Sequence, residues 1–448
     1  MTKIKFIAPG TPIYAAAAEI VKRIRANDAD AYFVGGCVRN MLMHKSCKDV
    51  DIVCSLPFEK ISEIFPDSIL AGAAFGVNII RHKGFAFELA SAREERCYMD
   101  GRHPESVHFT TDFEVDSKRR DFTVNAMLYD PEKQEIIDWH GGISDIKKGI
   151  LRTVGKSDER FKEDYLRLLR AIRFAAKYHL TIADETWEAI CSNAHLTAET
   201  APERIMQELD MMFSHESCAD AVKLLDKSGI LKFILPEVAE LHGVEQPHQW
   251  HPEGDVFTHT MNMLNRIALP DCDLAWSVLL HDIGKKPCFV RDEKGIHFYG
   301  HEARGAVMAN DILTRLRLPN KRKELISTLV KDHMRFVQVK NMKTATIRKF
   351  LGREDLPLLL ELNRLDSVCS SNDLNDWLFM LGKIGSFRGE EILPEPLITG
   401  KTLLQLGYKP GPEFTKILTF IYDMQLSDKK IDFKRACDLI KKHFPCIL

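Results

Sequence analysis

A pair of glycines followed by a pair of aspartates constrains the N-terminal part of this chain most strongly. Gly35 and Gly36 end an apolar run that begins at Ala31, and Asp49 and Asp51 stand two apart at the start of the next apolar run. Side chains two apart on a β-strand point to the same face of the sheet. The pattern therefore predicts a strand, a glycine turn, a helix and a second strand that presents both carboxylates together.

The chemistry of this unit points to phosphate transfer. Two carboxylates on one face can share a pair of divalent cations about 3.5–4 Å apart, the arrangement used for in-line phosphoryl transfer. The glycine turn lets backbone N–H groups approach a polyphosphate, and Arg39 adds a fixed cation. Each motif is weak alone, because Asp-x-Asp pairs are common on surfaces and the third glycine of a dinucleotide fingerprint is missing. Together they predict nucleotidyl transfer, with Asp49 and Asp51 as catalytic metal ligands.

Composition limits the possible class of protein. The 448 residues indicate more than one domain, and 45% hydrophobic with 28% charged residues is typical of globular proteins. A net charge of −2 argues against indiscriminate coating of nucleic acid. The eleven cysteines include no Cys-x-x-Cys pair, which predicts a reducing cytoplasm. We also expect no signal peptide and no membrane span.

The pattern of apolar residues changes near residue 156. Short strand-like runs precede it, and long amphipathic helical stretches follow it, the first of them predicted as one helix over 158–178. This pattern predicts an α+β N-terminal part followed by all-α regions. The resemblance to known families that the motifs carry implies a head of the polymerase-β type, that is a nucleotidyltransferase head (1–155), then a helical neck that binds base and RNA (156–245), an HD domain (246–370) and a helical C-terminal RNA-binding region (371–448).

Two further motifs carry charge at the expected site. Arg119, Arg120 and Asp121 precede a predicted strand, where Arg120 could hold phosphate or ribose and Asp121 could complete the acidic cluster. Asp164 and Arg167 stand three apart in a predicted helix and would lie side by side. An acceptor beside a donor matches the hydrogen-bonding edges of cytosine and adenine and opposes those of guanine and uracil. A surface charge run and an ion-pair ladder are the alternative interpretations.

These motifs, in this order, resemble class II tRNA nucleotidyltransferases, the CCA-adding enzymes, and the related bacterial poly(A) polymerases. The resemblance extends over nearly the whole chain. One departure is Asn40, where the family usually has an acid. The stretch from Arg93 to His108 resembles the flexible loop of the family, which favours completion of the terminal A. The matching motifs begin at Val34, Asp49, Arg119, Asp138, Glu163, Pro202 and Leu397.

The resemblance implies a role for each matching residue. Asp49 and Asp51 would bind Mg2+, and Asp164 and Arg167 would read the base. The implied partners are tRNA, CTP and ATP, with no membrane. Exposed cations between Lys147 and Lys162 would contact the tRNA backbone. The residues expected to contact the nucleotide are Gly36, Arg39, Arg120, Asp164, Arg167, Arg170 and Arg173.

The C-terminal half contains a second set of candidate ligands. His259, His281-Asp282 and Asp366 resemble the metal site of HD phosphohydrolases, and His301 and His333 could add ligands. Imidazole and carboxylate ligands suit a divalent transition metal with open positions. The implied chemistry is hydrolysis of phosphomonoesters or 2′,3′-cyclic phosphates at RNA ends.

Four functions remain open from the sequence. The first is template-independent CCA addition to tRNA, and the second is a poly(A) polymerase or an A-adding tRNA nucleotidyltransferase. The third is an HD phosphohydrolase that uses the head as an RNA-binding module. The fourth is a tRNA-binding protein without catalysis, which the intact ligand sets at both sites disfavour.

Overall fold

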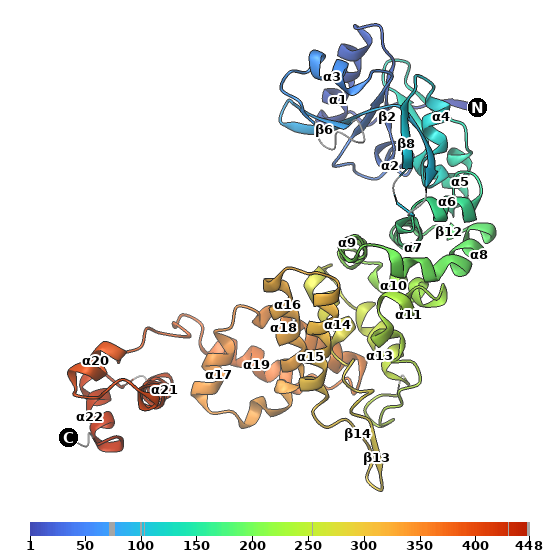
Figure 1. Ribbon diagram of the computed structural model, residues 1–448. Helices are drawn as coiled ribbons and strands as arrows, with labels where there is room; N and C mark the ends of the chain where they lie inside the picture. The colour runs from blue at the N-terminus through green and yellow to red at the C-terminus, as the bar shows by residue number, and fades with distance from the viewer. Residues whose placement is uncertain (71–76, 99–100, 103, 253, 429, 446–448) are drawn as a thin grey trace. The chain divides into compact units, whose positions relative to one another are not determined.

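The computed structural model describes residues 1–448 apart from 71–76, 99–100, 103, 253, 429 and 446–448 (Figure 1). The chain divides into unit 1, Met1–Ala239, and unit 2, Glu240–Leu448. A mixed sheet with helices occupies the first part of unit 1, and helices dominate the rest of the chain. This arrangement confirms the predicted fold class.

Within the described residues, an eight-stranded sheet has the order β1-β10-β9-β2-β3-β6-β5-β4. β3 and β6 run parallel, and the other neighbours are antiparallel. The strands are β1 (Thr2–Lys5), β2 (Ala31–Val34), β3 (Asp51–Cys54), β4 (Ile69–Leu70), β5 (Val77–His82), β6 (Phe85–Ser91), β9 (Leu128–Asp130) and β10 (Glu135–Asp138).

The two faces of the sheet differ in how they are covered. Alternate side chains of β2, β3 and β6 enter the main core, which α1 (Pro12–Arg25), α2 (Gly36–Leu42) and α3 (Phe58–Ile64) cover. Val34 and Val53 belong to a small apolar cluster on the opposite face. Asp51 shares the face of Val53, and Glu88, between core residues Phe87 and Leu89, shares the same face because side chains alternate. The thinly covered face therefore carries the acidic residues.

The helices after the sheet complete unit 1. Two short strands, β11 (Ile150–Leu151) and β12 (Thr181–Ile182), pair in parallel between them. The helical elements are α4 (Phe113–Lys118), η2 (Thr123–Asn125), α5 (Gly142–Lys148), α6 (Ser157–Glu163), α7 (Leu166–Tyr178), α8 (Asp184–Asn193), η3 (Ala194–Glu199), α9 (Pro202–Phe213), α10 (Cys218–Lys227), α11 (Leu231–Ile234) and α12 (Pro236–Ala239).

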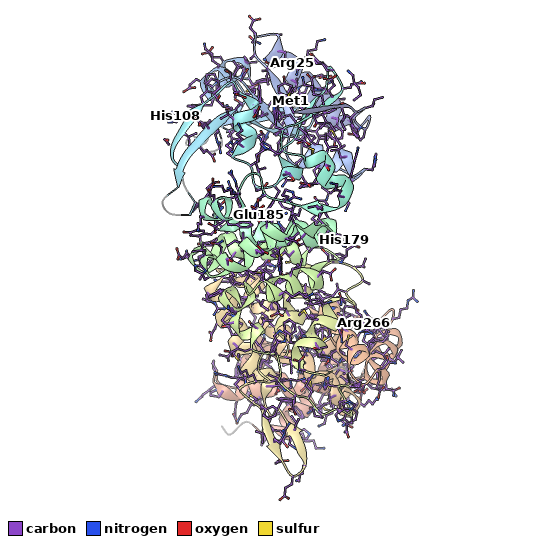
Figure 2. The ribbon with its side chains drawn as sticks, turned by 90° about the vertical axis from the view of Figure 1, so that its right-hand side faces the viewer. Met1, Arg25, His108, His179, Glu185 and Arg266 are labelled. Carbon is purple, nitrogen blue, oxygen red and sulfur yellow. The ribbon has the colours of Figure 1, made fainter. Side chains whose placement is uncertain are left out.

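The stretch that resembles a flexible loop forms an antiparallel ribbon. β7 (Arg93–Tyr98) pairs with β8 (Pro104–Phe109), and His108, labelled in Figure 2, lies on this ribbon. The expected loop residues Asp100 and His103 lie outside the described residues. The sequence pattern identified only the second strand.

The predicted single helix over 158–178 is wrong. It is interrupted at Asp164, whose backbone is extended with φ −147° and ψ 107°. The backbone N–H of Tyr165 donates to the carbonyl of Gly101 instead of continuing α6. The Asp164 carboxylate accepts from the N–H of Leu166, the first residue of the next helix, at 3.1 Å. Contacts with distant parts of the chain therefore override a continuous helical pattern.

Unit 2 is mostly helical. A hairpin of β13 (Val290–Asp292) and β14 (Gly295–His297) interrupts the helices, and α20, α21 and α22 enclose a separate apolar cluster. The helical elements are α13 (Val256–Leu264), α14 (Cys272–Leu280), α15 (His301–Arg315), α16 (Asn320–Asp332), η4 (His333–Asn341), α17 (Thr344–Leu351), α18 (Leu356–Cys369), α19 (Asn375–Ser386), α20 (Gly400–Gln405), α21 (Pro412–Ser427) and α22 (Phe433–His443).

Among the described residues, no helix is both long enough and apolar enough to cross a membrane.

The end of β10 is fixed by Asp138, whose carboxylate is buried with 3% of the residue exposed. It accepts from the backbone N–H groups of His140, Gly141 and Ile143 at 2.9–3.0 Å, which orients the start of α5. Gly142 lies so close to the carbonyl of Thr123 that an added Cβ would be 2.2 Å from the oxygen. This motif thus joins the sheet to η2, which carries Asn125.

We predict that Asp138→Ala lowers the free energy of unfolding of unit 1 by about 2–3 kcal/mol, because three backbone donors lose a buried acceptor. Asp112→Ala removes an exposed cap of α4 and should cost about 1 kcal/mol. Chemical denaturation followed by circular dichroism measures both. Equal losses in the two variants would contradict the role given to Asp138.

Candidate functional site

A pocket of about 470 Å³ in unit 1 is lined by both predicted metal ligands, Asp49 and Asp51, and by Gly36, Arg39 and Arg173 of the predicted nucleotide-binding set. α2, the segment before β3, α7 and His215 form its walls. The charged lining residues are Arg39, Lys45, Lys48, Arg173 and Lys177 against Asp49 and Asp51. This excess of cations matches a ligand with several negative charges.

Asp51 begins β3 and pairs with Val34 of β2, whereas Asp49 precedes the strand. The prediction that both aspartates lie within one strand is therefore only half correct. Burial, with added repulsion from Glu88, raises the pKa of Asp51 to about 6. A Cβ built on Gly35 would lie 3.5 Å from Oδ2 of Asp51, so the glycine turn contacts this carboxylate. Gly35 has φ +77°, which favours glycine.

Glu88 is a residue that the sequence reasoning missed. It lies on β6, where Leu89 is paired in parallel register with Ile52 of β3. Because Ile52 pairs with Leu89, Glu88 is the β6 neighbour of Asp51 on the same face of the sheet, and its charge helps to raise the pKa of Asp51. In the sequence, Glu88 is visible only as an acid between two apolar residues of a predicted strand. The pairing of β6 with β3 is what places this acid beside Asp51. Three carboxylates thus converge at the site: Asp49, Asp51 and Glu88.

Arg39 is buried and held from three sides. Its Nη1 donates to Asn125 Oδ1 at 2.6 Å and its Nη2 to the Tyr178 hydroxyl at 2.6 Å. Its Nε and Nη2 also donate to Asn40 Oδ1 at 3.2 and 3.0 Å. The amide oxygen of Asn40 therefore accepts the hydrogen bonds that a carboxylate could accept at this position. The ring of Tyr178 lies 4.2 Å from the Arg39 Cζ. Gly36 completes the contact, because a Cβ there would be 3.3 Å from Nη2.

Asp121 lies in an arginine network. Its carboxylate accepts from Arg170 at 2.7 and 2.9 Å and from Asn125 at 3.1 Å. Burial alone would raise the pKa of Asp121, but Arg170, Asn125 and Arg167 together outweigh burial and lower the pKa to about 2. Arg173 donates to the buried Glu208 at 2.6 Å. These bonds orient Arg173 at the pocket wall.

Arg120 stands at the edge of the same site. It donates to Asp116 at 3.1 Å, and its Nη1 would lie 3.8 Å from a Cβ on Gly35. Arg120 therefore lies beside the glycine turn, as expected of a phosphate-binding cation.

Asp164 and Arg167 are engaged with other groups. Asp164 accepts from both Nη atoms of Arg204 at 2.9 Å. Arg167 is 9% exposed and donates to the backbone carbonyls of Arg160 and Arg119 at 3.0 Å each. Asp164 therefore lies before α7 and Arg167 within it, although the N–H of Arg167 donates to the carbonyl of Asp164 at 2.9 Å. The structure adds Arg204, which the sequence analysis included only as part of a family motif.

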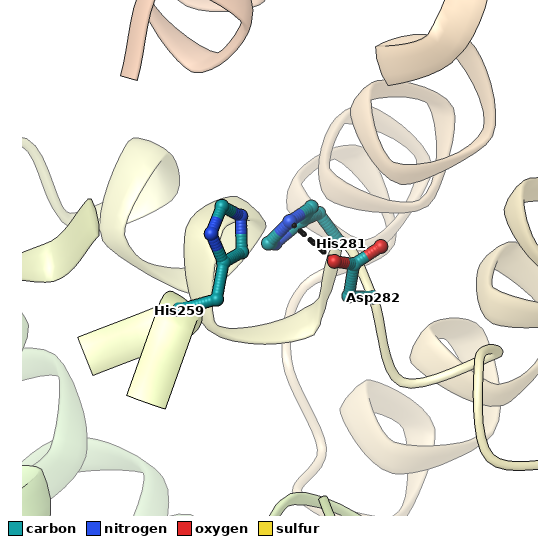
Figure 3. Close-up of side chains that lie close together, drawn as sticks. All are labelled: His259, His281 and Asp282. Carbon is teal, nitrogen blue, oxygen red and sulfur yellow. Dashed lines mark ion pairs between the residues drawn. The ribbon is translucent and has the colours of Figure 1, made fainter. Parts of the chain in front are cut away.

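Unit 2 brings its predicted ligands together. His259, His281 and Asp282 form one group that could hold a metal ion (Figure 3). Asp282, His301 and His333 form a second group. His281 Nε2 lies 3.0 Å from Asp282 Oδ2, and His259 Nε2 lies 3.2 Å from Asp366 Oδ1. Asp282 is shared, so both groups belong to one centre.

Backbone carbonyl groups orient the histidine rings of this centre. Nδ1 of His281, His301 and His333 each lies 2.6–2.9 Å from the backbone carbonyl three residues earlier. Nδ1 then carries the proton and Nε2 is left free to act as a ligand. Burial, with repulsion from His281, lowers the pKa of His333 to about 4, so its ring is neutral at pH 7. The buried Nε2 of His281 faces the Asp282 carboxylate, which fits two ligands that bind the same metal.

Comparisons with known proteins agree with this geometry. Residues 31–152 match the family model of the Poly A polymerase head domain. Residues 179–241 match the probable RNA and SrmB-binding site of polymerase A, and residues 255–369 match the HD domain. These matches show that successive segments of this chain are similar to a Poly A polymerase head and to an HD domain.

The relatives in curated collections point to a narrower group. A CCA-adding enzyme of Geobacillus thermodenitrificans is 39% identical over 229 residues, which are 51% of this chain and 56% of that protein. A CCA-adding enzyme of Streptococcus uberis is 42% identical over 43% of this chain and 48% of its own length. The chain therefore spans about half the length of the curated relatives it matches.

Solved structures extend the similarity over the whole fold. The Bacillus stearothermophilus CCA-adding enzyme in complex with CTP has a TM-score of 0.75 at 25% identity, with 96% of this chain and 98% of that chain covered. The Thermotoga maritima CCA-adding enzyme complexed with tRNA shares the fold, with a TM-score of 0.63 at 18% identity over 99% of both chains. The chain is thus similar to CCA-adding enzymes, and the resemblance seen in the motifs is confirmed.

Proposed function

We propose that this protein adds C, C and A in turn to the 3′ end of tRNA, using CTP and ATP. The observation that carries the proposal is the unit 1 pocket, where a glycine turn, a carboxylate cluster and five cations converge. The similar enzyme from Bacillus stearothermophilus was solved with CTP, and the one from Thermotoga maritima with tRNA. In each addition the 3′-hydroxyl oxygen bonds to the α-phosphorus as the bond to pyrophosphate breaks.

The cations of the pocket would hold the triphosphate. Arg39 is fixed by Asn125 and Tyr178, and Arg173 is fixed by Glu208, so neither must be ordered when the nucleotide binds. Lys177 lies among these cations, and burial with repulsion from Arg173 lowers its pKa. A polyphosphate would relieve this repulsion. Gly36, Arg120 and Arg170 complete the proposed contacts.

Asp49 and Asp51 would hold magnesium, with Glu88 beside them. The crowding that raises the pKa of Asp51 is what a divalent cation would relieve, so these residues fit a metal. Bound magnesium would supply charge neutralisation at the triphosphate and the reacting hydroxyl. The carboxylates themselves position that charge beside the glycine turn.

Asp164 and Arg167 would read the base. Asp164 lies in a bidentate pair with Arg204, which already presents an acceptor beside donors. The exocyclic amino group of an incoming cytosine or adenine would donate to the Asp164 carboxylate, whereas guanine would present a carbonyl acceptor there instead. Arg204 is thus proposed as a further member of the base-reading set.

The proposed division of the chain follows the predicted head, neck, HD domain and C-terminal region. The head would carry the chemistry, and the exposed Lys147, Lys148 and Lys162 would contact the tRNA backbone. We propose the cytoplasm as the location of the reaction, because Cys47 and Cys191 are free thiols.

Loss of a proposed metal ligand should abolish nucleotide addition. Asp51→Ala should lower incorporation of CMP and AMP more than about 100-fold. Even the loss of a residue that only hydrogen-bonds to a metal ligand lowers activity about 10–100-fold. The assay offers purified protein and magnesium with tRNA lacking CCA, ending in C or ending in CC. Asp67→Ala, an exposed aspartate outside the pocket, is the control and should retain activity.

The products of this assay separate the alternatives. Ordered addition that stops at CCA on tRNA alone supports the proposal. Addition of A only to tRNA ending in CC would indicate an A-adding enzyme, and long A tails on an unrelated RNA would indicate a poly(A) polymerase. No incorporation by the unaltered protein would contradict all three.

Loss of the proposed base-reading carboxylate should weaken the choice among the four nucleotides. Asp164→Ala should reduce the preference for CTP and ATP over GTP and UTP by roughly tenfold, the value of one good bidentate contact. The measurement compares kcat/KM for the four nucleotides. Asp158→Ala is a control, because this exposed aspartate of α6 pairs with Lys162 outside the pocket. Unchanged selectivity in Asp164→Ala would remove Asp164 from the base-reading set.

A second function is favoured by the histidine centre of unit 2. We propose that it holds a divalent transition metal on His259, His281, Asp282 and Asp366 and hydrolyses phosphate esters at RNA 3′ ends. The metal would supply an activated water. The oxygen of water bonds to phosphorus, and a nucleoside hydroxyl leaves with a proton. A phosphomonoester thus yields inorganic phosphate, and a 2′,3′-cyclic phosphate opens to a monoester.

We predict that His281→Ala loses bound metal and hydrolysis of adenosine 2′,3′-cyclic phosphate by more than about 100-fold, because the ligand set loses a member. Metal content by atomic emission and phosphate release measure the two effects. His443→Ala, on α22, should retain both. Asp49→Ala should retain hydrolysis while losing nucleotide addition, and loss of both activities in that variant would contradict two separate centres.

A further inference from the structure

The pocket at the histidine centre of unit 2 has an aromatic rim. This unit 2 pocket has a volume of about 660 Å³ and includes Asp282 and Asp366 on its floor. Trp250 and Tyr299 line it, yet they are 54% and 72% exposed. The ring of His297 stacks on Tyr299, with centroids 5.2 Å apart and planes 15° apart. We name Trp250, His297 and Tyr299 the aromatic rim.

The elements that carry the rim hold it close to the metal ligands. His297 ends β14, and Tyr299 precedes His301, the first residue of α15. Nδ1 of His301 lies 2.9 Å from the carbonyl of Phe298, the residue between the two rim positions. The same short segment therefore places a flat exposed surface and a candidate ligand at one pocket.

The charge of the unit 2 pocket differs from that of the unit 1 pocket. Its aspartates are Asp282, Asp366, Asp373 and Asp376, and its lining contains a single lysine, Lys285. Lys285 is already paired with Asp282 at 2.7 Å. A triphosphate would be repelled here, whereas one phosphate can be neutralised by one bound metal.

Hydroxyl and amide side chains form part of the same lining. Asn363, Ser367, Ser370 and Ser371 lie on α18 or directly after it, together with Asp366. Such groups hydrogen-bond to sugar hydroxyls and phosphate oxygens. The pocket thus offers a flat apolar surface, a polar wall and a metal centre within one volume.

We propose that the unit 2 pocket binds an unpaired nucleotide that carries a single phosphate, with its base stacked on the aromatic rim. This inference rests on the hydrolytic function proposed for the same centre. Stacking on aromatic side chains accepts any base, because every base has a π-face. The site then selects a nucleotide over a simple phosphate ester through Trp250 and Tyr299, and it excludes nucleoside triphosphates through its aspartates.

The test compares two substrates with one phosphate each, adenosine 3′-monophosphate and glycerol 2-phosphate. Trp250→Ala and Tyr299→Ala should each raise KM for adenosine 3′-monophosphate roughly tenfold, the loss expected for one stacking contact, with kcat unchanged. Neither variant should alter the rate with glycerol 2-phosphate. Trp250→Phe keeps a flat ring and should restore KM. Leu269→Ala, an 83% exposed residue outside the pocket, is the control.

A binding measurement separates this inference from the hydrolytic function. Tryptophan fluorescence of the unaltered protein should be quenched by adenosine 3′-monophosphate with metal withheld, and Trp250→Phe should lose that quenching. Quenching without hydrolysis of either substrate would support the rim and contradict the hydrolytic function. Hydrolysis with unchanged KM in both alanine variants, or quenching that persists in Trp250→Phe, would overturn the inference.

Discussion

The arrangement of unit 1 depends on the repulsion among carboxylates at one face of a sheet. Asp51 is partly buried beside Glu88, and this environment raises its pKa to about 6. Such crowding opposes folding unless cations offset it. The protein meets this constraint with Arg120 and with the glycine turn at Gly35, both of which lie within contact distance of the same site. The negative charge that opposes folding at this face of the sheet is the charge that would bind a divalent cation.

A second set of contacts joins the sheet to the helices that follow it within unit 1. Arg39 of α2 reaches Asn125 of η2 and Tyr178 of α7, and Arg170 of α7 reaches Asp121. Guanidinium groups suit this task because they donate in several directions at once. The helix that would select the base is therefore bonded directly to the residues that would hold the triphosphate.

The two pockets use opposite balances of charge. The unit 1 pocket has five cations against two aspartates, and the unit 2 pocket has four aspartates against one lysine. The first balance favours a ligand with many negative charges, and the second favours a ligand whose single phosphate is neutralised by a metal. Local charge therefore distinguishes the proposed ligands, although the chain as a whole carries a net charge of only −2.

The sequence by itself determined the strands that carry the first motif, since β2 and β3 begin and end where the apolar runs do, and it identified His259, His281, Asp282 and Asp366 as one set. Local patterns are sufficient for the strands, because alternation along a strand is a property of short segments. The ligand set, spread from 259 to 366, came from the resemblance to HD phosphohydrolases. The sequence did not identify Glu88, because an acid between two core residues gains its role only when β6 pairs with β3. It also placed Asp164 in a helix that the pairing with Arg204 and the contact of Tyr165 with Gly101 interrupt. Such outcomes depend on residues far apart in the chain, whose contacts outweigh local propensity, and only the tertiary structure decided them.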